Sequence, residues 1–136
     1  MRAIPDGGFT IADIVAWLQS AGYSAKVVTG NSGEPHVVSN TQGTPFNIFT
    51  GDCKGERCAS LELAAGFSTS GKFDISLLNE WNSKNRWCRA YYDSVNDPWL
   101  EMDIDLWPGG TYESLDDQFA AWNTTLGRFI AKYSLR

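Results

Sequence analysis

The sequence predicts an α+β fold in which helices pack on an antiparallel sheet of about five to six strands. Two observations predict this class: segments with a period of two are joined by tight turns, and segments with helical spacing interrupt them. The clearest alternation spans 99–107, where four apolar residues point to one side, namely Leu100, Met102, Ile104 and Leu106. The expected element order is α-β-β-β-β-α-β-β-α.

The first half of the chain is expected to hold one helix and four strands. Thr10 can cap a helix over 11–21, and Gly22 suits a left-handed stop. Strands are then expected at Tyr23–Thr29, His36–Asn40, Phe46–Asp52 and Cys58–Phe67.

The second half is expected to hold two helices around a hairpin. Asp74 is expected to cap a helix over 75–85, with Ile75, Leu77, Leu78 and Trp81 on its buried side. A strand over Trp87–Asp93 returns into the strand that starts at Trp99. Thr111 opens a final helix with an apolar seam at Leu115, Phe119, Trp122, Leu126, Phe129 and Tyr133. This seam either lies along the sheet or in part faces a second subunit.

Length and composition indicate a single domain over 1–136. With 136 residues, 43% of them hydrophobic, the chain is long enough to bury a core. We expect this core to span 10–133 and the segment 1–9 to be poorly ordered.

Charge and hydropathy exclude several classes of partner. The net charge of −5 disfavours a nucleic-acid partner, because it repels phosphate groups, and no stretch approaches the roughly 20 apolar residues of a membrane span. The first residues lack the apolar run of a secretory signal. The expected location is therefore the cytoplasm, or the periplasm if a leader has been removed.

The last hairpin is expected to display polar and aromatic side chains together. A three-residue loop, 95–97, keeps Cys88, Ala90 and Tyr92 on the core face. It places Arg89 opposite Asp103 and Tyr91 opposite Glu101, with Asp93 opposite Trp99 and Trp87 opposite Asp105. In this register Glu101 and Asp105 are diagonal neighbours of Arg89.

The outer face of this hairpin is the candidate partner-binding site. Its residues are Trp87, Arg89, Tyr91, Trp99, Glu101, Asp103, Asp105 and Trp107. Exposed aromatic and arginine side chains dominate many binding surfaces, which favours a docking surface. The alternatives are a solvated face laced with ion pairs, or a divalent cation held by the three carboxylates.

The cysteines leave three alternatives open. Cys53 and Cys58 bracket a hairpin tip and can form a disulfide, remain free thiols, or provide half of a zinc site, although no second pair follows. Cys88 lies on the core face and is expected to be a small buried apolar residue. No metal or cofactor is expected.

The sequence carries no catalytic signature. His36 is the one histidine, no nucleophile elbow is present, and the glycine-containing turns do not match a phosphate-binding loop. We therefore expect a protein that is not an enzyme.

Four segments together resemble the YbjN family of bacterial sensory transduction regulators. They are CASLELAAGF at 58–67, LNEWN at 78–82, NRWCRAY at 85–91 and LEMDID at 100–105. The resemblance covers about 10–129 and implies a fold similar to type III secretion chaperones, which are small acidic dimers that bind extended protein segments. It also implies that Asn82 ties the second helix to the following strand.

Together these features predict a regulatory or chaperone-like module that binds a protein or peptide, as a homodimer. The alternative is a small-molecule or metal-responsive sensor, with an apolar pocket between the last helix and the sheet, lined by Phe119 and Trp122.

Overall fold

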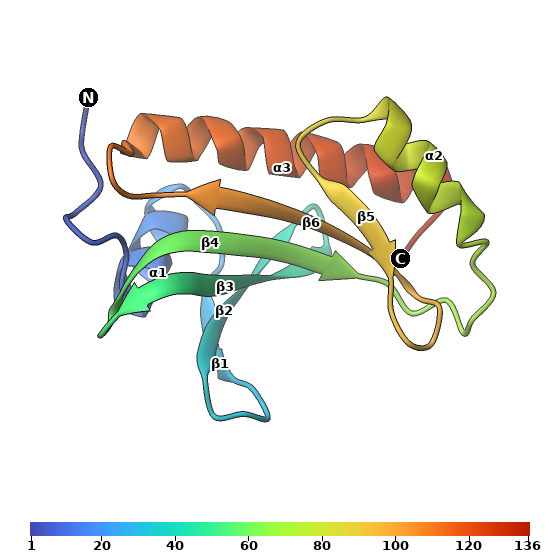
Figure 1. The fold of residues 1–136 in the computed structure, drawn as a ribbon, viewed down its shortest axis with the longest axis horizontal. Coiled ribbons are helices and arrows are strands. Elements are labelled where there is room, and N and C mark those ends of the chain that lie inside the picture. The colour runs from blue at the N-terminus through green and yellow to red at the C-terminus, as the bar shows by residue number, and fades with distance from the viewer.

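A six-stranded antiparallel sheet and three helices make up the fold, in a computed structural model that describes residues 1–136 (Figure 1). The helices are α1 (Ile11–Ser20), α2 (Ser76–Lys84) and α3 (Tyr112–Tyr133). The strands are β1 (Lys26–Thr29), β2 (Pro35–Thr41), β3 (Thr44–Lys54), β4 (Arg57–Gly66), β5 (Arg89–Tyr92) and β6 (Pro98–Asp105). Their order in the sheet is β1-β2-β3-β4-β6-β5. The predicted class and element order are confirmed.

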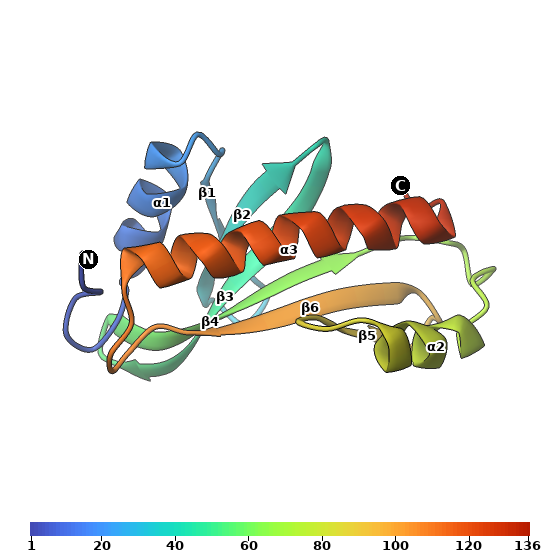
Figure 2. The same cartoon turned by 90° about the horizontal axis from the view of Figure 1, so that it is seen from above.

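One face of the sheet carries the core. Alternate residues of β6 and β4 are buried, and α3 runs along this face (Figure 2). The side chains of α1 and α2 join the same core, since Trp17 of α1 contacts Phe119 and Trp81 of α2 contacts Phe129. The result is one cluster of 26 buried hydrophobic residues. The helices therefore line the core face of the sheet, and the side chains that alternate with the buried ones point to the other face.

The N-terminal ends of α1 and α3 follow the sequence prediction. Thr10 and Asp13 form a reciprocal capping box at α1, and the hydroxyl of Thr111 accepts from Ser114 N at α3. The predicted seam of α3 is buried against the sheet, except that Tyr133 is half-buried. The seam is thus occupied within a single chain, as the first alternative predicts.

The start of α2 differs from the prediction. The helix begins at Ser76, and its N-cap is Ile75, which makes no side-chain capping bond. Asp74 instead accepts hydrogen bonds from the backbone N and hydroxyl of Ser76, so its side chain closes a local turn before the helix. Leu78 and Trp81 are buried, whereas Ile75 and Leu77 are half-buried.

Asn82 links α2 to β5, as the resemblance implies. Its Nδ2 donates to the carbonyl of Ala90 at 2.9 Å, and its Oδ1 accepts from Ala90 N at 2.8 Å. The side chain of Asn82 therefore bonds both backbone groups of Ala90, the buried residue of β5.

The N-terminal segment over 1–9, expected to be poorly ordered, contacts the rest of the fold at several points. Phe9 and Ile4 belong to the core, and Phe9 exchanges both backbone hydrogen bonds with Cys58. Gly8 is required at this contact, because a Cβ there would lie 1.9 Å from the carbonyl oxygen of Cys58. Leu135 also belongs to the core, which therefore extends past 10–133 at both ends.

The predicted register of the last hairpin is wrong by two positions. Arg89 pairs with Glu101 and Tyr91 with Trp99. Asp93 N donates to Asp97 O, and the Asp93 carboxylate accepts from the N–H groups of Val95 and Asp97, so the loop closes over 93–97. A slip of two residues preserves the alternation, so Arg89, Tyr91, Glu101 and Asp103 keep their predicted face.

Two residues of this hairpin depart from their predicted places. Trp87 precedes β5 with a φ of 78° and therefore does not face Asp105. Tyr92, expected on the core face, is 52% exposed because it ends an edge strand that has a neighbour on one side only.

Candidate functional site

The side of the sheet opposite the core is the candidate site, and we call it the open face. Strands β3, β4, β6 and β5 contribute to it. Their residues on this face are Asn47, Phe49, Gly51, Ser60, Glu62, Ala64, Trp99, Glu101, Asp103, Asp105, Arg89 and Tyr91. Cross-strand pairing aligns them in rows, with Phe49, Glu62 and Asp103 forming the central row. The alternation predicted for β6 places its three carboxylates on this face.

Arg89 stands among three carboxylates, but not the three expected from the sequence. Its guanidinium bonds Asp103 at 2.8 Å and Glu101 at 2.5 Å, and lies 3.5 Å from Glu62. Glu62 thus takes the place predicted for Asp105, because the hairpin register differs and because β4 lies beside β6. One positive charge among three negative ones leaves this cluster with an excess of two negative charges.

The electrostatics of the cluster reflect this excess. Partial burial raises the pKa of Glu62, and the neighbouring charges of Glu101 and Asp103 raise it further. The hydrogen bond to Asp103 raises the pKa of Arg89, which stays charged. Burial and a hydrogen bond to the Glu101 carboxylate raise the pKa of Tyr91, which stays neutral and donates its phenolic proton.

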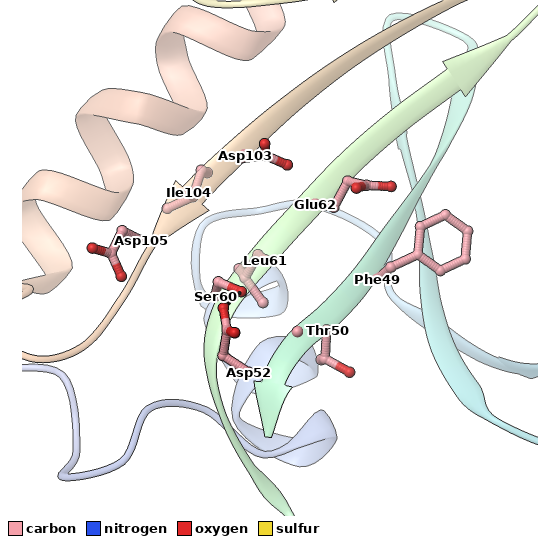
Figure 3. A pocket seen from close by; sticks show the side chains of 10 residues that line it. Phe49, Thr50, Asp52, Ser60, Leu61, Glu62, Asp103, Ile104 and Asp105 are labelled. Carbon is pink, nitrogen blue, oxygen red and sulfur yellow. Dashed lines mark hydrogen bonds between the residues drawn. The ribbon is translucent and has the colours of Figure 1, made fainter. Parts of the chain in front are cut away.

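Next to this cluster the open face forms an acidic hollow of about 640 Å³ (Figure 3). Carboxylates from three strands line it: Asp52 of β3, Glu62 of β4, and Asp103 and Asp105 of β6. Gly51 has no side chain, so the floor of the hollow is bare at this position. A Cβ there would lie 2.8 Å from Ser60 Oγ. Ser60 Oγ donates to Asp52 at 2.9 Å. No group of three or more His, Cys, Asp or Glu side chains is arranged to hold a metal ion.

Aromatic side chains extend the site at both ends of the hairpin. The Trp99 ring stacks on Tyr91, with centroids 6.3 Å apart, and its Nε1 donates to Asp93. Trp87 is 63% exposed, and the guanidinium of Arg86 lies over its ring. Trp107 lies beyond β6 and lines a second hollow with Asp52 and Asp105.

The structure therefore brings most of the predicted site residues together. Arg89, Tyr91, Glu101 and Asp103 are in direct contact through hydrogen bonds, and Trp99 adjoins them. Asp105 lies further along β6, while Trp87 and Trp107 flank the face from outside the strands.

The open-face residues of β3 and β4 escaped the sequence prediction, Phe49 and Glu62 among them, as did Asp52 in the hollow. The sequence does indicate that Glu62 faces away from the core, because its neighbours Leu61 and Leu63 point to the core. Its position beside Asp103 depended on the order of the strands, which alternation does not give.

The remaining candidate residues lie at other places. Cys53 and Cys58 face each other across the β3–β4 hairpin and form a disulfide. Cys88 is buried, and burial raises the pKa of its thiol to about 12. The His36 ring lies on Phe49 and contacts the Asn47 side chain.

The space between α3 and the sheet is filled by aromatic rings. Phe119 contacts Trp17, Tyr23 and Phe46, and Trp122 contacts Phe46. Both residues are at most 4% exposed. The apolar pocket expected there for a sensor is therefore occupied by the side chains of the chain itself.

Comparison with known proteins gives the family of this chain. A family model described as "Putative bacterial sensory transduction regulator" matches residues 10–133. The chain belongs to this family, YbjN. None of the curated proteins matches it. None of its helices is both long and apolar enough to cross a lipid bilayer.

Proposed function

We propose that the chain is a non-enzymatic regulatory protein that binds a basic segment of a partner protein on its open face. One observation carries the proposal: the helices occupy one side of the sheet, and the other side presents carboxylates in excess beside exposed aromatic rings. A monomeric surface that combines rings with unbalanced charge is typical of a binding site.

The chemistry of the partner follows from the charge. Arg89 neutralises part of the cluster, whereas Asp105 makes no ion pair. A segment with lysine or arginine residues would compensate the remaining carboxylates, and charge complementarity of this kind also accelerates association. Exposed rings such as Trp87 would contact the aliphatic parts of such a segment.

The arrangement favours binding over catalysis. Its carboxylates lie in rows on an open sheet, the Asp103 side chain is 63% exposed, and the single histidine contacts an amide rather than a nucleophile. General acid–base catalysis needs a group poised beside a reacting atom in a sheltered site. The membership of a regulator family supports the same choice.

A charge-reversal pair tests the proposal. Immobilised wild type, Asp103→Lys and Asp117→Lys are exposed to lysate of the native cell, and the captured protein is purified and titrated against each by calorimetry. Asp117 is an exposed residue of α3, so it matches the charge change on the helix side. We expect Asp103→Lys to weaken the affinity about tenfold or more, and Asp117→Lys to leave it unchanged. Equal affinities would refute the open face as the site.

Homodimer formation stays a prediction. The seam of α3 that could have served a dimer is buried within one chain, so a dimer would use another surface. The mass in solution, from sedimentation equilibrium, decides between one and two chains.

A further inference from the structure

The outer edge of β6 is paired over only half of its length. β6 runs from Pro98 to Asp105, but β5 pairs with it only from Pro98 to Glu101. β5 begins only at Arg89, and just before it the chain makes a bend at Trp87, whose φ is 78°. The second half of β6 thus has β4 on one side and no strand on the other (Figure 1).

The backbone groups on this free edge belong to Asp103 and Asp105. Leu106 N donates to Ala59 O at 2.8 Å, which shows that the even-numbered residues of β6 direct their backbone groups to β4. In an antiparallel ladder alternate residues direct both backbone groups to the same neighbour. Met102 and Ile104 therefore bond β4, while the N–H and C=O groups of Asp103 and Asp105 point outward, where no strand pairs with them.

This edge is held firmly in a conformation ready for pairing. Met102 and Ile104 are 3% and 1% exposed, so the core fixes the strand between the two outward-facing residues. An unpaired, ordered edge of this kind accepts an extended peptide as an added strand.

The side chains beside the edge select the occupant. An added strand would continue the line of β5, and its residues opposite Asp103 and Asp105 would lie on the open face, with Cβ atoms about 4.5–5.5 Å away. β5 already shows the favoured chemistry, because its Arg89 stands opposite Glu101 and reaches Asp103. Acidic residues at these positions would be repelled, which also discourages pairing with a second copy of this acidic edge.

We infer that the partner segment binds by strand addition along β6 at Asp103–Asp105, as an extended peptide with lysine or arginine at alternate positions. This inference rests on the proposed function and adds to it the conformation of the segment and the backbone groups that hold it.

Amide hydrogen exchange by NMR tests the inference with a synthetic probe. The probe is an acetylated and amidated peptide of four Lys-Val repeats, with four Glu-Val repeats as its control. In the free protein the amides of Asp103 and Asp105 should exchange faster than those of Met102 and Ile104. Saturation with the Lys-Val peptide should slow the exchange of Asp103 and Asp105 about tenfold or more, and the Glu-Val peptide should not. Absence of binding by the Lys-Val peptide would overturn the inference.

A pair of substitutions at Asp105 separates backbone pairing from charge. Asp105→Pro and Asp105→Asn both remove the carboxylate, but only proline removes the outward N–H, which bonds nothing in the fold. Circular dichroism checks that both variants fold. Strand addition predicts that Asp105→Pro binds the Lys-Val peptide about tenfold more weakly than Asp105→Asn, one lost hydrogen bond being of that size. Equal affinities would overturn it.

The tests distinguish failure of strand addition from failure of the proposed function. If the Lys-Val peptide shifts open-face resonances of β3 and β4 without protecting Asp103 and Asp105, strand addition is wrong while the open face remains the binding site. If the captured partner binds Asp103→Lys and Asp117→Lys equally well, the open face itself is wrong.

Discussion

The indole of Trp99 lies directly over the backbone of Gly66. A Cβ at Gly66 would come within 2.4 Å of the ring, and Trp99 then stacks on Tyr91 and bonds Asp93. These three contacts together fix the ring at the end of the open face. Trp99 is consequently a structural residue of the site as well as part of its surface.

Replacement of Gly66 by alanine should displace this ring. We expect a loss of about 1–3 kcal/mol in the free energy of unfolding, because the methyl group overpacks a fixed aromatic contact. Gly30→Ala is the matched control, since a Cβ there has 3.8 Å to its nearest neighbour. Urea denaturation measures both, and equal midpoints would show that Trp99 is free to move.

Removal of the Glu62 charge should stabilise the protein at neutral pH. Its pKa is raised, so the native state holds this proton more tightly than the unfolded state, and the charged form is unfavourable above the raised pKa. With the side chain 40% exposed, solvent screening limits the gain from Glu62→Gln to about 0.5 kcal/mol. The gain should vanish at about pH 3, where the carboxylate is protonated in both states.

Replacement of Glu101 by glutamine should destabilise the protein, whereas the same replacement at Glu62 should stabilise it. Glu101 is 13% exposed and accepts from both Arg89 and Tyr91. Glu101→Gln should therefore lower the free energy of unfolding at pH 7 by about 1–2 kcal/mol, as expected for bonds to a charged group. Thermal denaturation of the two variants between pH 3 and 7 compares them. Destabilisation by Glu62→Gln would contradict the assignment of an acidic excess.

Asn82 should matter for the edge strand as much as for α2. Asn82→Ala leaves both backbone groups of the buried Ala90 without their partner, which should cost about 1–3 kcal/mol. Asn82→Asp keeps the acceptor and loses the donor, so its loss should be smaller. Amide exchange of β5 follows the local effect, and unchanged protection at Ala90 would show that Asn82 does not hold the strand.

Alkylation distinguishes the disulfide from free thiols. The disulfide joins Cys53 to Cys58, and Cys88 is buried with a pKa of about 12. We expect no labelled cysteine in the native protein, one in denaturant, and three in denaturant with reductant, as counted by mass spectrometry. Reduction should lower the free energy of unfolding by about 2 kcal/mol, the loop-closure value for so short a loop. Three labels without reductant would refute the bond.

The sequence predicts best where the signal is local. Alternation in β6 and capping at Thr10 depend on neighbouring residues, and both are as predicted. The hairpin register depends on the Asp93 side chain, which gathers N–H groups of its own loop and so widens the turn. The alternation of the strands is the same for both registers, so it does not predict which one forms.

Long-range contacts explain the other differences. The place of Glu62 beside Asp103 requires β4 to lie next to β6, although β5 comes between them in the chain. The contact of the N-terminal segment with the core includes the pairing of Phe9 with Cys58, 49 positions away. Such pairings leave no periodic trace in the sequence.

Hydrogen–deuterium exchange of the chain with and without its captured partner tests the central claim most directly. The account predicts slower exchange in the peptides that cover β5 and β6, and unchanged exchange in those that cover the outer surface of α3. Protection confined to α3, with β6 unaffected, would contradict it.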